Sequence, residues 1–152
     1  MFVFDFVQVG GESTNVATWI DGNRPRLSEL AAMSWEQHHG LLPVGLDSAG
    51  PFAAAVGFPV MSGEAVRFPI SWSIGLTPNL VVILAAELSV QPFLGGAVHI
   101  ELQGSCRELV GWMTELENDH ARKVMLAGVR SFMASLVVEL ERVAERPIET
   151  SE

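Results

Sequence analysis

The segment EAVRFPISWS, residues 64–73, alternates apolar and polar side chains over most of its length. Successive side chains of a β-strand point to opposite sides, so every second residue shares a face. One apolar and one polar face predict a strand in a sheet that is covered on one side only. Pro69 predicts an edge position or a bulge, because proline cannot donate to a strand ladder. The apolar face carries Val66, Phe68, Ile70 and Trp72.

The flanking sequence continues the same pattern. Residues 79–93 begin as an apolar run and then alternate, and residues 97–106 alternate again, with Ile100 and Leu102 on the apolar side. Gly95-Gly96 between them predicts a hairpin turn. Residues 2–9 and 52–58 are also predicted as strands, which together indicate an antiparallel sheet.

Two short helices are predicted between the first strand and the rest of the sheet. The first starts near Ser13 and runs to about Asp21, where Gly22-Asn23 stops it. The second has Pro25 in its first turn and ends at Gly40, and residues 41–51 are predicted as a loop.

The C-terminal third changes to a helical period. Apolar residues recur at three- and four-residue steps from about Leu109 to Arg146, and Pro147 ends the helix. This face contains Met125, Val129, Phe132, Met133, Leu136 and Leu140. Residues 1–147 are therefore predicted as one domain and residues 148–152 as a polar tail.

The predicted fold class is α+β. A curved antiparallel sheet, two short helices near the N-terminus and one long C-terminal helix over the sheet form a helix-grip arrangement. The long helix must cover the apolar sheet face. One helix cannot fill a strongly curved sheet everywhere, so we expect a pocket between them.

Four segments resemble the SRPBCC superfamily, the START-type, birch-pollen-allergen-like helix-grip proteins, and in particular small bacterial members without a described function. They are Arg67-Phe-Pro-Ile-Ser-Trp72, Glu87-Leu-Ser-Val-Gln-Pro92, Ile100-Glu-Leu-Gln-Gly-Ser105 and Arg122-Lys-Val-Met-Leu-Ala-Gly-Val-Arg130. The resemblance implies a deep apolar cavity. It also implies a range of functions that includes lipid and hormone carriers, polyketide cyclases and aromatases, and chaperone cofactors, among which a fold alone does not choose.

Nine inward-facing residues are the candidate ligand-binding site. Ordinary core packing explains at least half of such a set, whereas methionines and aromatic rings also suit irregular apolar ligands. The candidates are Phe68, Ile70, Trp72, Ile100, Leu102, Met125, Val129, Phe132 and Met133.

The charge and cysteine content of the chain limit which partners and which compartment we expect. The chain has 18 acidic and 9 basic residues, a formal net charge of −9, which repels phosphate backbones and anionic lipid. The longest apolar run, residues 80–86, is too short to span a bilayer. We therefore expect a hydrophobic small-molecule partner, no nucleic acid and no membrane insertion, in a monomer or homodimer. The single cysteine, Cys106, and the absence of a signal sequence favour the cytoplasm.

No metal, cofactor or catalytic residue is predicted. His38 and His39 are neighbours that point in different directions, and a metal site needs three or four convergent ligands. Cys106 with a histidine would supply a nucleophile and a base only if the two met in space. A free cysteine is more often a small buried hydrophobe. His99 and Glu101 are predicted to face outward with the polar side of their strand.

Three functions follow from these features. The first is binding of an apolar or aromatic, lipid- or polyketide-like molecule in an internal cavity. The second is a cyclase or aromatase that uses the same cavity, which requires polar groups inside it to move protons. The third is a protein-interaction module with a filled core.

Overall fold

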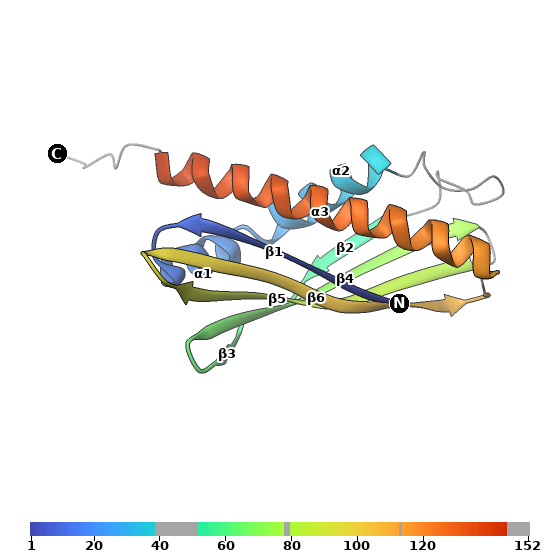
Figure 1. The fold of residues 1–152 in the computed structure, drawn as a ribbon, viewed down its shortest axis with the longest axis horizontal. Coiled ribbons are helices and arrows are strands. Elements are labelled where there is room, and N and C mark those ends of the chain that lie inside the picture. Colours follow the sequence, from blue (N-terminus) through green and yellow to red (C-terminus); the bar gives the residue numbers. More distant parts are fainter. Residues whose placement is uncertain (39–51, 78–79, 113, 146–152) are drawn as a thin grey trace.

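The structure is a computed structural model that describes residues 1–38, 52–77, 80–112 and 114–145. The α+β helix-grip architecture predicted from the sequence is confirmed: a six-stranded antiparallel sheet carries helix α3 along one face, with the two N-terminal helices beside it (Figure 1). In chain order the elements are β1 (Phe2–Gly10), α1 (Ser13–Gly22), α2 (Arg24–His38), β2 (Phe52–Val56), β3 (Val60–Ser62), β4 (Ala65–Thr77), β5 (Leu80–Phe93), β6 (Ala97–Val110) and α3 (Glu115–Glu145).

The strand order is β1-β6-β5-β4-β2, with β3 also paired to β4. Strand β1 therefore forms one edge of the sheet although it comes first in the chain. The hairpin predicted at Gly95-Gly96 joins β5 to β6, and both glycines have positive φ. Strand β3 was not predicted, because its three residues are too few to show an alternation.

The predicted alternation correctly assigns the two faces of the sheet. Residues that pair across neighbouring strands share a face, and the row Phe68–Leu88–Leu102 lies on the side of α3. We call this side the inner face and the opposite side the outer face. All three residues of the row are fully buried, whereas Phe2, Phe4 and Phe6 on β1 face outward into solvent.

Pro69 lies at an interruption of the sheet rather than at its outer edge. Its carbonyl accepts a hydrogen bond of 2.8 Å from the Gly57 backbone N–H, in the gap between the last pair of β2 and the first pair of β3. In an antiparallel strand the N and C=O of one residue point to the same side. The proline nitrogen therefore faces this gap, where no ladder donor is needed.

The predicted start of the long helix near Leu109 is wrong. Strand β6 continues to Val110 and pairs there with the start of β5, and α3 begins at Glu115. The apolar run at the start of β5 needs a hydrogen-bonded neighbour, which this part of β6 supplies. A capping box fixes the helix start: the Glu117 N–H donates to Thr114 Oγ1 and the Thr114 N–H donates to Glu117 Oε1, both at 3.2 Å.

Helices α2 and α3 pack side by side and are joined by polar contacts at two points. Arg26 Nε donates to Glu139 Oε1 at 3.1 Å, and Ser131 Oγ donates to Gln37 Oε1 at 3.0 Å. The Glu139 contact raises the pKa of Arg26, so this cation keeps its charge. These contacts hold α2 against the middle and the end of α3.

Several predicted features lie outside the described residues. They are His39, the helix end at Gly40, the loop 41–51, Pro147 and the polar tail 148–152. Within the described residues, none of the helices combines the length and the apolar character needed to cross a bilayer.

Candidate functional site

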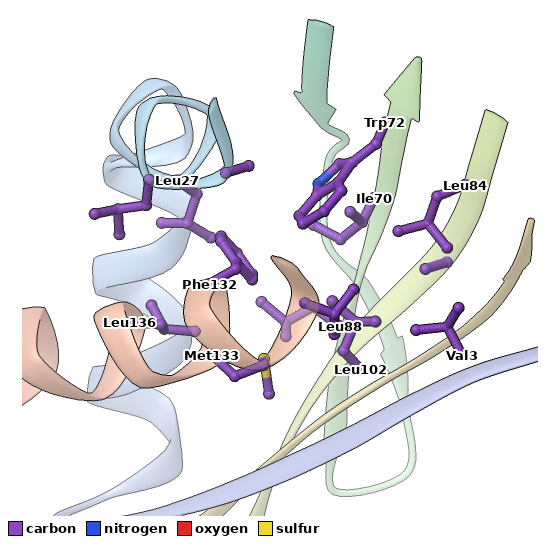
Figure 2. Packing of buried hydrophobic residues seen from close by; sticks show 14 of the residues in the cluster. Val3, Leu27, Ile70, Trp72, Leu84, Leu88, Leu102, Phe132, Met133 and Leu136 are labelled. Carbon is purple, nitrogen blue, oxygen red and sulfur yellow. The ribbon is translucent and has the colours of Figure 1, made fainter. Parts of the chain in front are cut away.

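The nine predicted site residues come together in one packed cluster. Three come from β4, two from β6 and four from α3, and each is between 0 and 3% exposed. Figure 2 shows Ile70, Trp72 and Leu102 pointing from the sheet toward Phe132 and Met133 on α3. In the described part of the chain, these side chains contact one another and leave almost no surface accessible to water.

An aromatic chain runs through this cluster and connects four elements. Trp35 of α2 stacks on Phe52 of β2 with ring centroids 6.0 Å apart, and Phe52 meets Trp72 of β4 edge-on at 5.5 Å. Trp72 in turn meets Phe132 of α3 at 5.8 Å and 88°. Edge-to-face contacts between rings are favourable beyond their buried area, so this chain fixes α2 and α3 on the sheet.

A groove of about 280 Å³ opens at the margin of the cluster, between α1 and the β3–β4 hairpin. We call it the α1 groove. Phe68, one of the nine predicted residues, lines it together with side chains from α1 and from the segment around β3. Its lining is Thr14, Ala17, Thr18, Asp21, Pro59, Met61, Val66 and Phe68.

The polar groups of the α1 groove all come from α1. Thr14, Thr18 and Asp21 recur at steps of four and three, so they share one face of the helix. Thr18 Oγ1 donates its hydrogen to the Thr14 carbonyl at 2.7 Å, which leaves its lone pairs free to accept. Asp21 lies 3.6 Å from Arg24 Nε, and the Arg24 guanidinium sits 4.2 Å over the exposed ring of Phe58. The groove thus combines apolar walls with hydrogen-bond acceptors on one side.

The sequence alone did not reveal this groove. It depends on β3 folding back beside α1, and neither the short strand nor its neighbour in space follows from local periodicity. One signal was present in the sequence: Phe58, Val60 and Met61 are apolar residues between two strands, and the structure leaves all three exposed beside the groove.

Two further hollows are lined by described residues. A broad one of about 640 Å³ lies on the outer face of the sheet over Ala85 and Gly104, and a small one of about 80 Å³ lies beside Met1 and Cys106. The outer hollow is larger than the α1 groove, but it is shallow, and Ile70 is the one predicted residue among those that line it. The α1 groove is therefore the better candidate for a small molecule.

Cys106 is a buried thiol rather than a nucleophile. Its side chain is 5% exposed, and burial raises its pKa to about 11, opposed only in part by the nearby N-terminal ammonium. The Met1 ammonium donates to the Cys106 carbonyl at 3.2 Å. His99 lies on the same strand but faces the opposite side of the sheet, so this histidine and the thiol do not meet. Because the thiolate is the reactive form, Cys106 is chemically inert near neutral pH.

Burial of Cys106 predicts a loss of stability at high pH. The folded protein holds this proton more tightly than the unfolded chain, whose thiol has the ordinary pKa of 9.0. Stabilisation is complete below pH 9 and is lost as the pH rises toward 11, with about 1 kcal/mol gone at pH 10. Urea unfolding at pH 7 and pH 10 should show this loss in the native protein and not in Cys106→Val. Equal losses in both proteins would contradict the assignment.

The histidines and acids of the described residues form no metal centre. No group of three or more His, Cys, Asp or Glu side chains converges among them. His99 and Glu101 face outward as predicted, with His99 Nε2 3.3 Å from Glu101 Oε1. The ring of His99 lies between Phe6 and Phe93, with centroids 5.3 and 5.7 Å away, and is therefore only partly exposed.

Comparisons with known proteins support the fold. No family model and no curated protein matches the sequence. A hypothetical protein of Helicobacter pylori superposes with a TM-score of 0.52 at 14% identity, over 91% of this chain and 87% of that chain.

Weaker similarities are to the Zhui aromatase/cyclase of Streptomyces sp. R1128 and a START superfamily protein of Mycobacterium smegmatis. The first has a TM-score of 0.41 at 11% identity and covers 96% of each chain. The second has a TM-score of 0.34 at 8% identity, over 89% of this chain and 96% of that chain. The similarity to the Helicobacter pylori protein and the arrangement of the sheet and helices confirm the predicted fold alone: the chain has the helix-grip architecture.

Proposed function

We propose that the chain binds an apolar or aromatic small molecule that carries a hydrogen-bond donor, and that this molecule enters through the α1 groove. The observation that carries the proposal is an apolar groove that ends on Phe68, at the margin of the predicted binding cluster. Its volume of about 280 Å³ is roughly twice that of a dry cavity that holds benzene in another protein, so a molecule of one or two rings fits.

The polar wall specifies the ligand's other end. Thr18 has lone pairs to offer and Asp21 has a carboxylate, so both accept hydrogen bonds. A hydroxyl or amino group on the ligand would satisfy them, whereas a ligand carboxylate would be repelled by Asp21. The preferred class is therefore a phenol, an alcohol or a polyketide-like molecule with free hydroxyl groups.

The remaining eight predicted residues lie in the same buried cluster as Phe68. We propose that a longer ligand reaches them when Phe68 turns aside and the flexible side chains of Met125 and Met133 adjust. Moving the apolar surface of such a molecule out of water favours binding by roughly 25 cal/mol per Å², before the entropic costs of binding are subtracted. A single free thiol fits a reducing compartment, so we propose that the protein binds its ligand in the cytoplasm.

Binding is favoured over catalysis by the polarity of the interior. Among the described residues, Ser34 is the one fully buried polar side chain, and its hydroxyl donates to the Leu30 carbonyl of its own helix at 2.8 Å. A cyclase needs polar groups that face the substrate to move protons. The only titratable group lining the α1 groove is Asp21.

Filling the α1 groove should weaken binding. Thr18→Trp places an indole in the groove, so the affinity for 2-naphthol, a neutral fluorescent phenol of two rings, should fall at least about tenfold, a loss of roughly 1.4 kcal/mol. The measurement is a fluorescence titration of native and variant protein. Asn15→Trp is the matched control, because Asn15 is exposed on the same helix and does not line the groove.

Three outcomes of this titration are informative. Weaker binding by Thr18→Trp alone supports the α1 groove as the entrance. Saturable binding that neither variant changes would place the site elsewhere. No saturable binding to the native protein would contradict the proposed function.

If binding is observed, native mass spectrometry of the protein purified from its own host would identify a ligand that remains bound.

A further inference from the structure

The outer face of the sheet carries a row of aromatic rings that no helix of the described residues covers. Phe4 and Phe6 of β1 have ring centroids 6.2 Å apart, and the row continues through His99 of β6 to Phe93 of β5. Phe2 extends it along β1. We call these five residues the aromatic stripe. The four phenylalanines are 41–65% exposed.

The outer hollow of about 640 Å³ lies directly beside this stripe. Phe2 forms one of its walls, and Phe2 pairs across the sheet with Ser105, which pairs with Ala85. Ala85 and Ser105 have short side chains on this face, so the surface is low where the neighbouring stripe is high. The same face therefore presents a ridge and a depression next to each other.

A ridge beside a depression is self-complementary under a two-fold rotation. An axis that runs along the strands, between the stripe and the hollow, places the Phe2–Phe4 end of the ridge of one copy over the depression of the other, because these two residues are level with Ser105 and Gln103 of the hollow. A two-fold dimer uses the same patch on both copies, so this adjacency is the geometry that it requires. The outer face carries its exposed aromatic rings on one side and the hollow on the other. A second copy of the same face can therefore meet both at once.

The charges of the outer face also permit self-association. The chain as a whole has a net charge of −9, which opposes contact between copies. The charged side chains of the described strands on this face are Arg67, Arg107, Glu87 and Glu101, a balanced set. Arg67 Nη1 lies 3.6 Å from Glu87 Oε2 on the far side of the hollow, where each can also pair with the opposite charge of a second copy.

The exposed aromatic area is of the right size for a contact. A phenylalanine contributes about 200 Å², so four of them at these exposures leave roughly 400 Å² in water. That is within the range of the largest patch on a typical monomer and is about half of the roughly 800 Å² per partner in a standard interface. The rest of the outer face around the stripe and the hollow would supply the remainder.

We propose that the outer face of the sheet is the interface of a homodimer, in which the Phe2–Phe4 end of each aromatic stripe lies in the outer hollow of the other copy and the rest of the stripe packs on the surface beside it. The α1 groove and α3 lie away from this interface, so the proposal is independent of the proposed ligand. Both copies keep their grooves open in such a dimer.

The test is sedimentation velocity on the native protein over a dilution series. The native protein should sediment as a dimer that dissociates on dilution. Phe4→Glu/Phe6→Glu should raise the dissociation constant at least about 30-fold, because buried aromatic anchors carry most of the energy of an interface. The matched control is Leu116→Glu/Val138→Glu, which adds the same charge at exposed apolar positions of α3 and should leave the dimer intact. Circular dichroism confirms that each variant is folded.

A second variant separates this interface from strand pairing at the free edge of β1. Ala85→Trp fills the hollow but lies on β5, two strands from that edge. Under the proposal it also produces monomers. A dimer that Ala85→Trp leaves unchanged, while Phe4→Glu/Phe6→Glu disrupts it, would assign association to the β1 edge and overturn the proposal. A native protein that is monomeric throughout the series would overturn it as well.

Discussion

Phe132→Ala is expected to lower the free energy of unfolding by about 3–5 kcal/mol. Phe132 is 1% exposed and contacts Trp72 edge-to-face at 5.8 Å, at the end of the aromatic chain that connects α2, β2, β4 and α3. Removing the ring loses its buried apolar surface and leaves a cavity that the rigid rings around it cannot close. Urea denaturation followed by circular dichroism measures the loss.

The control for this prediction is Val138→Ala on the same helix. Val138 is exposed, so the change should stay within about 0.5 kcal/mol. A small loss in Phe132→Ala would mean that the ring borders free space rather than packed neighbours, which would favour a preformed internal cavity. A large loss accompanied by a second binding site for 2-naphthol would show that a cavity made there is accessible to small aromatic molecules.

Gly104→Ala is expected to destabilise the fold by about 3 kcal/mol, at the upper end of the cost of overpacking. A Cβ at this position would lie 2.3 Å from the Ala85 carbonyl oxygen and 2.5 Å from the Ala86 Cα. Both are backbone atoms of the neighbouring strand, so β5 and β6 would have to separate. Replacing glycine also reduces the entropy of the unfolded chain, but that gain is below about 1 kcal/mol and does not offset the collision.

Gly10→Ala is the matched control for Gly104→Ala. A Cβ on Gly10 would meet nothing within 4 Å, and its φ is not positive, so this change should be close to neutral. Thermal unfolding of the two variants gives the comparison. Equal stability of both would show that β5 and β6 can move apart freely at Gly104, and the outer hollow beside it would then lose its fixed shape.

The function proposed for the α1 groove and the interface proposed for the outer face make use of opposite sides of one sheet. Inner-face residues such as Phe68 meet the helices, whereas outer-face residues such as Phe6 meet solvent. Because the two faces are separated by the thickness of the sheet, the 2-naphthol titration and the sedimentation experiment report on them separately. Phe4→Glu/Phe6→Glu should therefore retain the affinity of the native protein for 2-naphthol.

The sequence by itself determined which side of each long strand faces the core. Alternation between neighbouring residues is a local property, so Phe68, Trp72, Ile100 and Leu102 could be assigned to one face without knowing their neighbours in space. The same holds for the apolar side of the C-terminal helix, whose period places Met125, Val129 and Phe132 together. These assignments were sufficient to predict the helix-grip fold.

Only the tertiary structure decided the features that depend on contacts between distant segments. Strand β6 continues to Val110 because the start of β5 needs a hydrogen-bonded neighbour, although the sequence pattern predicts a helix from about Leu109. The α1 groove exists because β3 lies beside α1, and a glycine is required at position 104 because β5 approaches so closely there that a Cβ would collide with the Ala85 and Ala86 backbone. Local periodicity reflects how one segment orients its side chains, whereas a groove or an interface depends on the distances between segments far apart in the chain, which only their packing sets.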